Sequence, residues 1–103
     1  MERHRLTNAE AAGFRVVGGT ARSQGAFMTL APGEATGGPD NRHPTSDQWL
    51  FVASGSGSAT VAGERVVLEA GDLLLIAAGE GHEIRAANGA PLVTLSVYAP
   101  PVY

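Results

Sequence analysis

The chain is 103 residues long, 44% of them hydrophobic and 17% charged, with a formal net charge of −3. This length suits one compact domain and excludes most large enzyme scaffolds. The sequence has no cysteine, which excludes disulfides, thiolate metal sites and cysteine nucleophiles, and its 7 basic residues, all arginines, are scattered, which argues against nucleic-acid binding.

Nothing in the sequence predicts export or insertion into a membrane. The N-terminal region contains no apolar stretch like that of a signal peptide, and no apolar run in the chain is long enough to form a membrane-spanning helix. We therefore expect a cytoplasmic protein that does not bind membranes.

The first part of the chain predicts a helical turn, then two strands and a long loop. Thr7-Asn8-Ala9-Glu10 has the spacing of a capping box, and Gly13 is placed to end the turn that this box would start. Residues 1–13 are expected to form an N-terminal extension. Residues 14–17 and 26–31 have strand character, whereas residues 32–45 are rich in Gly, Pro, Asp and Asn and predict an irregular loop.

The rest of the chain predicts short strands separated by regularly spaced glycines. Glycine recurs every eight residues from Gly55 to Gly79, a spacing typical of a β-sandwich or β-barrel. The expected strands span residues 48–53, 58–62, 64–69, 73–77, 82–87 and 92–99. Ala62-Gly63 predicts a tight hairpin, and the apolar run over 73–76 predicts a strand that is buried on both faces.

Strand alternation assigns side chains to the inside or the outside of this barrel. Gln48 falls on the same face as Leu50, which we expect to be the interior, and the same alternation places His82 inside. Trp49 and Phe51 fall on the opposite face and would form an exposed aromatic patch. A second sheet, the N-terminal segment or another subunit would cover this patch, and in a chain this short we expect the partner, a homodimer.

Two stretches are similar to the signature motifs of the cupin superfamily of small β-barrels. The first motif runs glycine, five residues, His-x-His, three or four residues, glutamate, six residues and glycine; here Asn41-Arg42-His43 precedes Gln48. The second motif runs glycine, five residues, proline, one residue, glycine, two residues and histidine; here Gly71 precedes Gly79 and His82.

This resemblance implies a fold, a domain and a metal site. The fold is all-β, the double-stranded β-helix or jelly-roll barrel of cupins, here with a short N-terminal helical turn. We expect one domain over residues 1–103, with its core signatures over residues 37–87. In the family, three histidines and a glutamate hold a divalent metal inside the barrel, and the corresponding positions in this chain are Asn41, His43, Gln48 and His82.

Two of these four positions depart from the family's residue type. Asn41 replaces a histidine and Gln48 replaces the glutamate, so the implied site has two imidazoles, two amides and no anionic ligand. Imidazole and amide oxygen remain acceptable ligands, and the metal is expected to be Zn, Ni, Mn or Fe, bound more weakly than in a site with a carboxylate. A bulge in the strand at Asp47 would restore a carboxylate ligand.

Each candidate residue also has a purely structural interpretation. His43 lies in a polar loop and is also explained as an exposed or locally hydrogen-bonded imidazole, and Asn41 is also explained as a turn residue. His82 could be a buried, hydrogen-bonded histidine, and Gln48 a polar brace between strands. The aromatic residues outside the motifs are expected to serve packing or an interface, namely Trp49, Phe51, Tyr98 and Tyr103.

Three functions remain open at this point. The first is a small homodimeric cupin that holds a divalent metal through His43 and His82, helped by Gln48, and receives a small polar ligand, either as an enzyme or as a binding protein. The second is a metal-free module that binds or senses a small, sugar-like molecule through the same residues and Asn41. The third is an interaction protein whose outer aromatic face binds a partner.

Overall fold

The computed structural model describes residues 1–6, 12–38 and 42–103. Its described residues form strands and connecting turns, with no helix among them. The strands are β1 (Gly13–Gly19), β2 (Gln24–Leu30), β3 (Ala35–Gly38), β4 (Asp47–Ser54), β5 (Ser56–Val61), β6 (Glu64–Glu69), β7 (Leu73–Ile76), β8 (His82–Ala86) and β9 (Leu92–Ala99). The prediction of an all-β fold is therefore confirmed.

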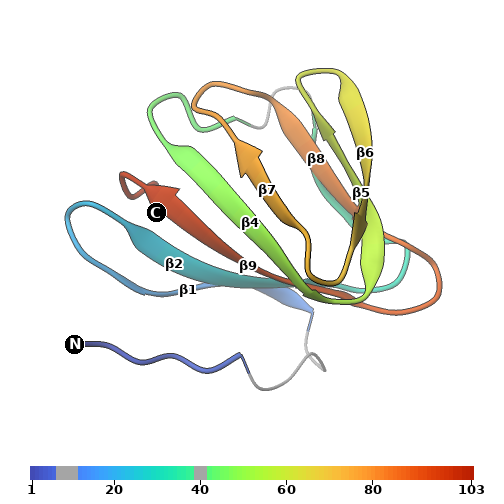
Figure 1. Cartoon of the computed structure of the whole chain (residues 1–103), viewed down its shortest axis with the longest axis horizontal. Helices are drawn as coiled ribbons and strands as arrows, with labels where there is room; N and C mark the ends of the chain where they lie inside the picture. Colours follow the sequence, from blue (N-terminus) through green and yellow to red (C-terminus); the bar gives the residue numbers. More distant parts are fainter. Residues whose placement is uncertain (7–11, 39–41) are drawn as a thin grey trace.

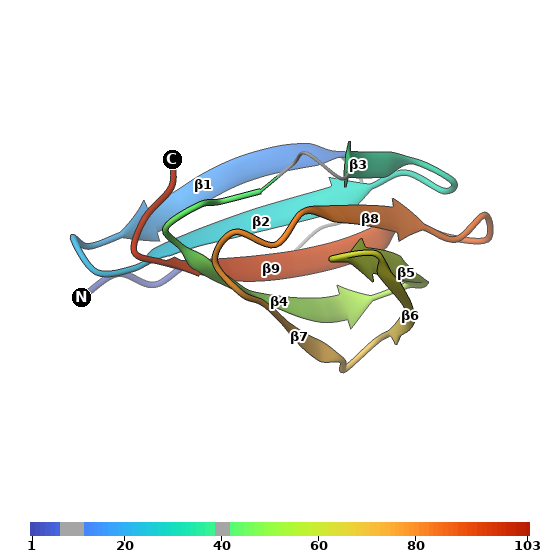
Figure 2. The ribbon, with the colours of Figure 1, turned by 90° about the horizontal axis from the view of Figure 1, so that it is seen from above.

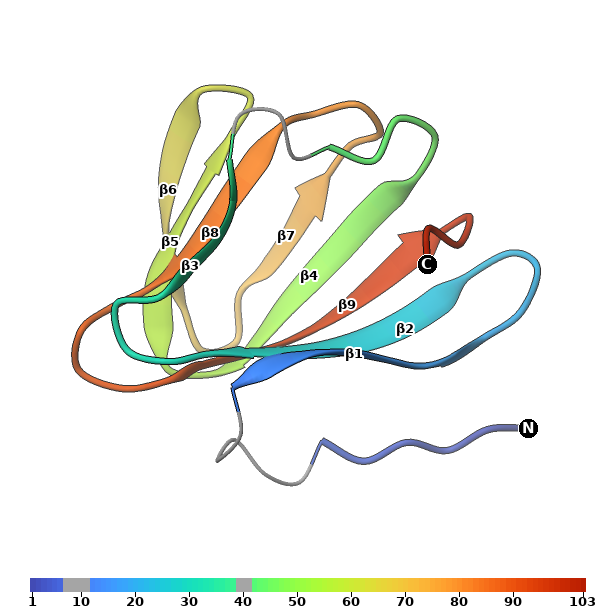
Figure 3. The same ribbon diagram turned by 180° about the vertical axis from the view of Figure 1, so that it is seen from behind.

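The strands form two antiparallel sheets that face each other (Figure 1). Sheet A has the strand order β1-β2-β9-β4-β7, and sheet B has the order β3-β8-β5-β6. The strand directions rotate progressively across sheet A, as the twist of β-strands requires (Figure 2). The two sheets converge where β4 passes into β5 and where β6 passes into β7, and they diverge toward the opposite end (Figure 3).

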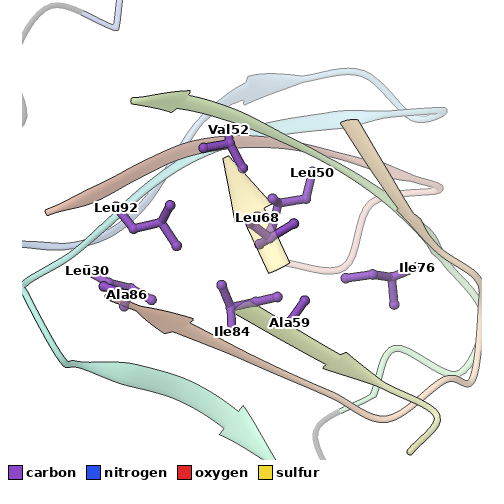
Figure 4. Close-up of a cluster of buried hydrophobic side chains, with 9 residues drawn as sticks. All are labelled: Leu30, Leu50, Val52, Ala59, Leu68, Ile76, Ile84, Ala86 and Leu92. Carbon is purple, nitrogen blue, oxygen red and sulfur yellow. The ribbon is translucent and has the colours of Figure 1, made fainter. Parts of the chain in front are cut away.

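The core lies between the inner faces of the two sheets. Leu50 and Val52 on β4 are buried, and so are Ile84 and Ala86 on β8, in agreement with the predicted alternation. These side chains belong to one cluster (Figure 4), which comprises Leu30, Leu50, Val52, Ala59, Leu68, Ile76, Ile84, Ala86 and Leu92. Burial of a Leu or Ile side chain contributes about 1.5–3 kcal/mol relative to exposure, so this cluster is a main source of stability.

The regularly spaced glycines occupy turns that require an unusual backbone conformation. Gly55, Gly63, Gly71 and Gly79 have φ angles of 83°, 82°, 97° and 85°, a region that residues with a side chain rarely adopt. Ala62 also has a positive φ, 49°, so Ala62 and Gly63 form the predicted two-residue hairpin between β5 and β6. The glycine spacing in the sequence therefore marked real turns.

The expectation that the strand over 73–77 is buried on both faces is wrong. β7 lies at the edge of sheet A, and Leu73 and Leu75 are 60% and 44% exposed, whereas Ile76 is buried. Only alternate side chains of a strand face the core, and at this edge the others meet solvent. Leu75 pairs with Trp49 and Leu73 with Phe51, so the apolar run extends the outer face of sheet A.

Residues 32–45 were expected to form one irregular loop, but they include β3. This strand pairs antiparallel with β8 and places Gly38 opposite His82. Its sequence, Ala-Thr-Gly-Gly, has little strand propensity. The strand therefore forms because it pairs with β8, and not because of its side-chain pattern. The pairing brings the backbone of β3 beside the first residue of β8.

The expected N-terminal helical turn is not borne out. Its capping box, Thr7-Asn8-Ala9-Glu10, lies outside the described residues. Gly13, which was expected to end the turn, instead begins β1. Among the residues that the structure describes, no helix is long and apolar enough to span a membrane.

Candidate functional site

A cavity of about 600 Å³ is lined by residues from both sheets and from the segments before β4 and after β9. The described lining residues are Phe14, Met28, Thr36, Gly37, Gly38, His43, Gln48, His82, Ile84, Tyr98 and Tyr103. None of these described residues is an acid, an arginine or a lysine, so imidazole, amide and hydroxyl groups supply the polar side chains of the wall. A cavity of this size suits a small organic molecule.

His82 is held in a defined orientation at the start of β8. Its side chain is buried, and its Nδ1 lies 3.1 Å from the carbonyl oxygen of Glu80. Because a carbonyl only accepts hydrogen bonds, Nδ1 of His82 is the donor. A backbone contact of this kind commonly orients a histidine whose other nitrogen binds a metal.

His43 comes from the segment before β4 and meets His82 in the cavity wall. The two ring centroids are 5.4 Å apart, and the His43 ring also packs edge-on against Tyr98 at 5.2 Å. Burial lowers the pKa of His43, and the nearby charge of His82 lowers it further. The His43 imidazole is therefore neutral near pH 7, the form that can accept a proton or bind a metal.

Gln48 contributes a buried amide whose two ends differ. The side chain is 4% exposed, and its Nε2 donates to the hydroxyl of Ser96 on β9 at 3.1 Å. Its Oε1 is buried and has no hydrogen-bond partner among the described residues. An unsatisfied buried acceptor costs about 1–3 kcal/mol, so a donor or a cation from outside the protein is expected at this atom.

The position of Ser96 explains why the oxygen of Gln48 is the unpaired end. Gln48 lies opposite Tyr98 in sheet A, and its Nε2 donates to the hydroxyl of Ser96 on the same strand. Burial, followed by the influence of Tyr103, raises the pKa of Tyr98 far above its ordinary value, so Tyr98 stays a neutral phenol. The bond to Ser96 holds the amide with Nε2 toward β9 and leaves Oε1 as an acceptor.

The structure brings together three of the four residues that the sequence singled out. His43, Gln48 and His82 line the same cavity, and Asn41 lies outside the described residues. The carboxylate of Asp47 does not join them. Its Oδ1 accepts a hydrogen bond from the backbone N–H of Ala78 at 3.0 Å, and Asp47 is not one of the described residues that line the cavity. The bulge considered at Asp47 is absent from the described pairing of β4, whose register shift lies further along the strand, between 52 and 54.

The sequence analysis missed two tyrosines of the cavity wall, because they were expected to serve packing or an interface. Tyr98 shares strand parity with Leu92, Thr94 and Ser96, all buried, so alternation could have assigned it to the interior. Tyr103 follows β9 and has no periodic pattern that would have placed it. Its position is a result of tertiary contacts alone.

The donor atoms of the cavity fit a divalent metal such as zinc or nickel. His43 and His82 supply imidazoles, and the unpaired Oε1 of Gln48 supplies a buried, neutral oxygen. The described part of the chain contains no group of three His, Cys, Asp or Glu side chains that could hold a metal, so the amide would have to complete the set. Such an uncharged set binds less strongly than one with a carboxylate, and it suits metals that accept nitrogen ligands.

The fold and this cavity agree with a match to a known family. The cupin domain matches residues 26–98, which extend from β2 to the last part of β9 and include His43, Gln48 and His82. The chain therefore belongs to the cupin family, whose fold is the double-stranded β-helix.

Three relatives illustrate the similarity. The chain is 36% identical over 75 residues to the tetracenomycin polyketide synthase protein TcmJ of Streptomyces glaucescens, a match that covers 73% of this chain and 48% of TcmJ. The chain thus spans about half the length of that relative. BH2720 of Bacillus halodurans has a similar structure, with a TM-score of 0.82 and 27% identity over 89% of this chain and 73% of BH2720. A conserved Klebsiella pneumoniae protein with a double-stranded β-helix domain has a TM-score of 0.78 and 26% identity, covering 93% of this chain and 82% of that protein.

Proposed function

We propose that this protein binds a divalent metal ion and a small organic ligand in the cavity between its sheets, with His43, Gln48 and His82 as metal ligands. The proposal depends chiefly on Gln48, whose Oε1 is buried without a described partner while Ser96 holds its Nε2. A cation beside Oε1 would satisfy this acceptor, and the two imidazoles supply the nitrogen ligands that zinc and nickel favour.

The residues of the wall support binding and orientation more than a particular reaction. A bound metal would supply Lewis acidity and lower the pKa of a coordinated water. Among the described lining residues no carboxylate is present to act as a base, and both imidazoles would hold the metal, so the wall offers no separate side chain to take up a proton. Tyr98 stays protonated and can offer only its hydroxyl.

A second candidate function is the binding of an organic ligand without a metal. The composition of the described wall favours it, because no carboxylate is present to offset the charge of a divalent ion. In that case a hydroxyl or N–H group of the ligand would donate to Gln48 Oε1. The relative TcmJ is named a tetracenomycin polyketide synthase protein, and an organic ligand for the present chain would be in keeping with that name.

Metal titration of the purified protein separates the two functions. Untagged protein is treated with a chelator and titrated with nickel and zinc by calorimetry, and thermal unfolding is followed with and without metal. We expect one ion per chain and a raised Tm, because a ligand that binds only the native state stabilises it. The substitutions His82→Ala and Gln48→Leu should each weaken nickel binding at least about tenfold, and Gln48→Glu should strengthen it by adding an anionic ligand.

Asp47→Asn is the matched control, since Asp47 is next to Gln48 but bonds to Ala78 outside the cavity wall. Its nickel affinity should equal that of the unmodified protein. If neither metal binds, or if His82→Ala binds nickel as tightly as the original chain, the metal site is wrong. The metal-free function then stands only if an organic probe binds and Gln48→Leu abolishes its binding.

We also propose that the outer face of sheet A pairs with the same face of a second copy. Trp49 pairs across the sheet with Leu75 and with Val97, and all three are partly exposed, so they form a continuous apolar row. A two-fold dimer places identical surfaces against each other and would remove both rows from water at once. This proposal retains the homodimer expected from the sequence.

A further inference from the structure

The cavity has an aromatic wall next to its polar groups. The ring of Tyr103 lies 4.9 Å from Phe14 and 5.3 Å from Tyr98, centroid to centroid, with the planes inclined by 53° and 76°. The His43 ring adjoins Tyr98 and Tyr103 at 5.2 and 5.8 Å, in both cases edge to face. Aromatic rings prefer to pack against one another in offset or edge-to-face arrangements, so a further aromatic ring that entered the cavity would find rings to pack against.

Tyr103 is held at the edge of this cavity although its side chain is well exposed. Gln24, 9% exposed, donates from Nε2 to the carbonyl of Tyr103 at 2.6 Å and accepts at Oε1 from the N–H groups of Val102 at 3.2 Å and Tyr103 at 2.9 Å. The hydroxyl of buried Ser46 donates to the carbonyl of Pro100 at 2.6 Å. These buried side chains fix the backbone over residues 100–103, so a 59% exposed ring lines the cavity in a defined position.

The described polar side chains of the cavity carry imidazole, amide and hydroxyl groups, and none is an acid, an arginine or a lysine. Gln48 Oε1 is the buried acceptor without a described partner, and His43 and His82 line the same cavity. Phe14, Met28, Ile84 and the tyrosine rings supply apolar surface. A sugar ring carries hydroxyls on all sides and needs several matched partners, because each buried hydroxyl without one is costly. A flat molecule with one polar end needs far fewer.

We propose that the organic ligand of this cavity is a planar aromatic compound that bears a hydroxyl group. Its ring packs against Phe14, Tyr98 and Tyr103, and its hydroxyl faces Gln48 and the two imidazoles. Tyr103 is then a specificity residue, because it supplies the exposed part of the aromatic wall. The inference rests on the proposed function, since it requires that the cavity take an organic ligand, and it narrows the class of that ligand.

The test compares an aromatic alcohol, its saturated counterpart and a sugar. Calorimetry measures the binding of 2-naphthol, of decahydro-2-naphthol, which has the same skeleton and hydroxyl but no aromatic ring, and of methyl β-glucoside. Each probe is titrated into the chelator-treated and the nickel-loaded protein. We expect 2-naphthol to bind about tenfold more tightly than the saturated alcohol, as several aromatic contacts together allow, and the glucoside to show no measurable binding.

Two substitutions at Tyr103 link this preference to the proposed wall. Tyr103→Ala should weaken 2-naphthol binding about tenfold, and Tyr103→Phe, which keeps the ring, should retain binding within about threefold. Both variants should stay folded, because the side chain is largely exposed, and thermal unfolding checks this. Equal binding of the two alcohols, tighter binding of the glucoside, or full 2-naphthol affinity in Tyr103→Ala would overturn the inference.

Nickel binding, measured in the same preparations, distinguishes a failure of the proposed ligand class from a failure of the proposed function. If nickel binds and 2-naphthol does not, the ligand class is wrong while the metal site stands. If neither nickel nor any of the three probes binds, the proposed function itself fails and the inference fails with it.

Discussion

The rings of His43 and His82 lie 5.4 Å apart although one residue precedes β4 and the other begins β8. Backbone hydrogen bonds bring them together, because the N–H of Gly79, in the turn before β8, donates to the carbonyl of His43 at 2.9 Å. The N–H of Ser46 donates to the same carbonyl at 3.5 Å. These backbone contacts therefore place the two imidazoles in one site.

Lowering the pH should destabilise the metal-free protein through His43. Burial and His82 lower the pKa of His43 below its usual 6.5. As the pH falls, this imidazole therefore binds a proton more readily in the unfolded chain than in the native protein. The free energy of unfolding should therefore be smaller at about pH 5.5 than at about pH 7.5, since stability rises with pH wherever the unfolded state binds more protons. Urea unfolding of the protein and of His43→Gln checks this, and an identical pH dependence in the variant would contradict it.

Ser96→Ala should destabilise the protein and weaken its metal binding together. The change removes the acceptor of Gln48 Nε2 and leaves that buried N–H unpaired, which should cost about 1–3 kcal/mol in urea unfolding. The amide also loses the contact that keeps Oε1 available, so nickel affinity should fall. Ser58→Ala, on the opposite side of β5 from buried Ala59, is the control and should change stability by no more than about 0.5 kcal/mol. A stable Ser96→Ala protein with full nickel affinity would show that Ser96 does not orient Gln48.

Trp49→Glu should convert the proposed dimer to a monomer. The substitution places a charge in the apolar row formed with Leu75 and Val97, and burying that charge without a partner opposes association. Sedimentation velocity at several protein concentrations measures the outcome. Val67→Glu makes a comparable change at an exposed position on sheet B and should leave the assembly intact. The proposed interface is wrong if both variants sediment like the original chain.

Gly55→Ala should lower the free energy of unfolding by at least about 2 kcal/mol, given the usual cost of a strained backbone. Gly55 has a φ of 83°, and a Cβ at this position would collide with the carbonyl of Pro91. Gly89→Ala is the matched control, since its Cβ would meet no atom within 4 Å and its φ is not positive. Chemical denaturation of the two variants should separate them clearly, and equal stabilities would contradict a conformational requirement at Gly55.

Patterns with a short range along the chain predicted much of this fold. The glycine spacing located turns because a positive φ at Gly63 or Gly79 is a local property of the backbone. Alternation placed Gln48 and His82 inside because successive strand residues face opposite sides. The family motifs selected residues that the fold brings to one cavity, although their role as metal ligands stays a prediction.

The predictions that failed concern pairing between distant segments. β3 exists because β8 offers it a partner, and its Gly-rich sequence contains no sign of that. Leu73 and Leu75 are exposed because β7 occupies the edge of sheet A, and an apolar run cannot indicate whether its strand will be central or at an edge.

By itself the sequence determined the fold class, the turns, the inward faces of β4 and β8 and the types of donor atom available inside. Only the tertiary structure decided that Ser96 holds the amide of Gln48 with its oxygen unpaired, and that Gln24 holds Tyr103 against the cavity. The reason is physical: turn conformation and alternation depend on neighbouring residues, whereas these contacts depend on strands that meet only when both sheets have formed.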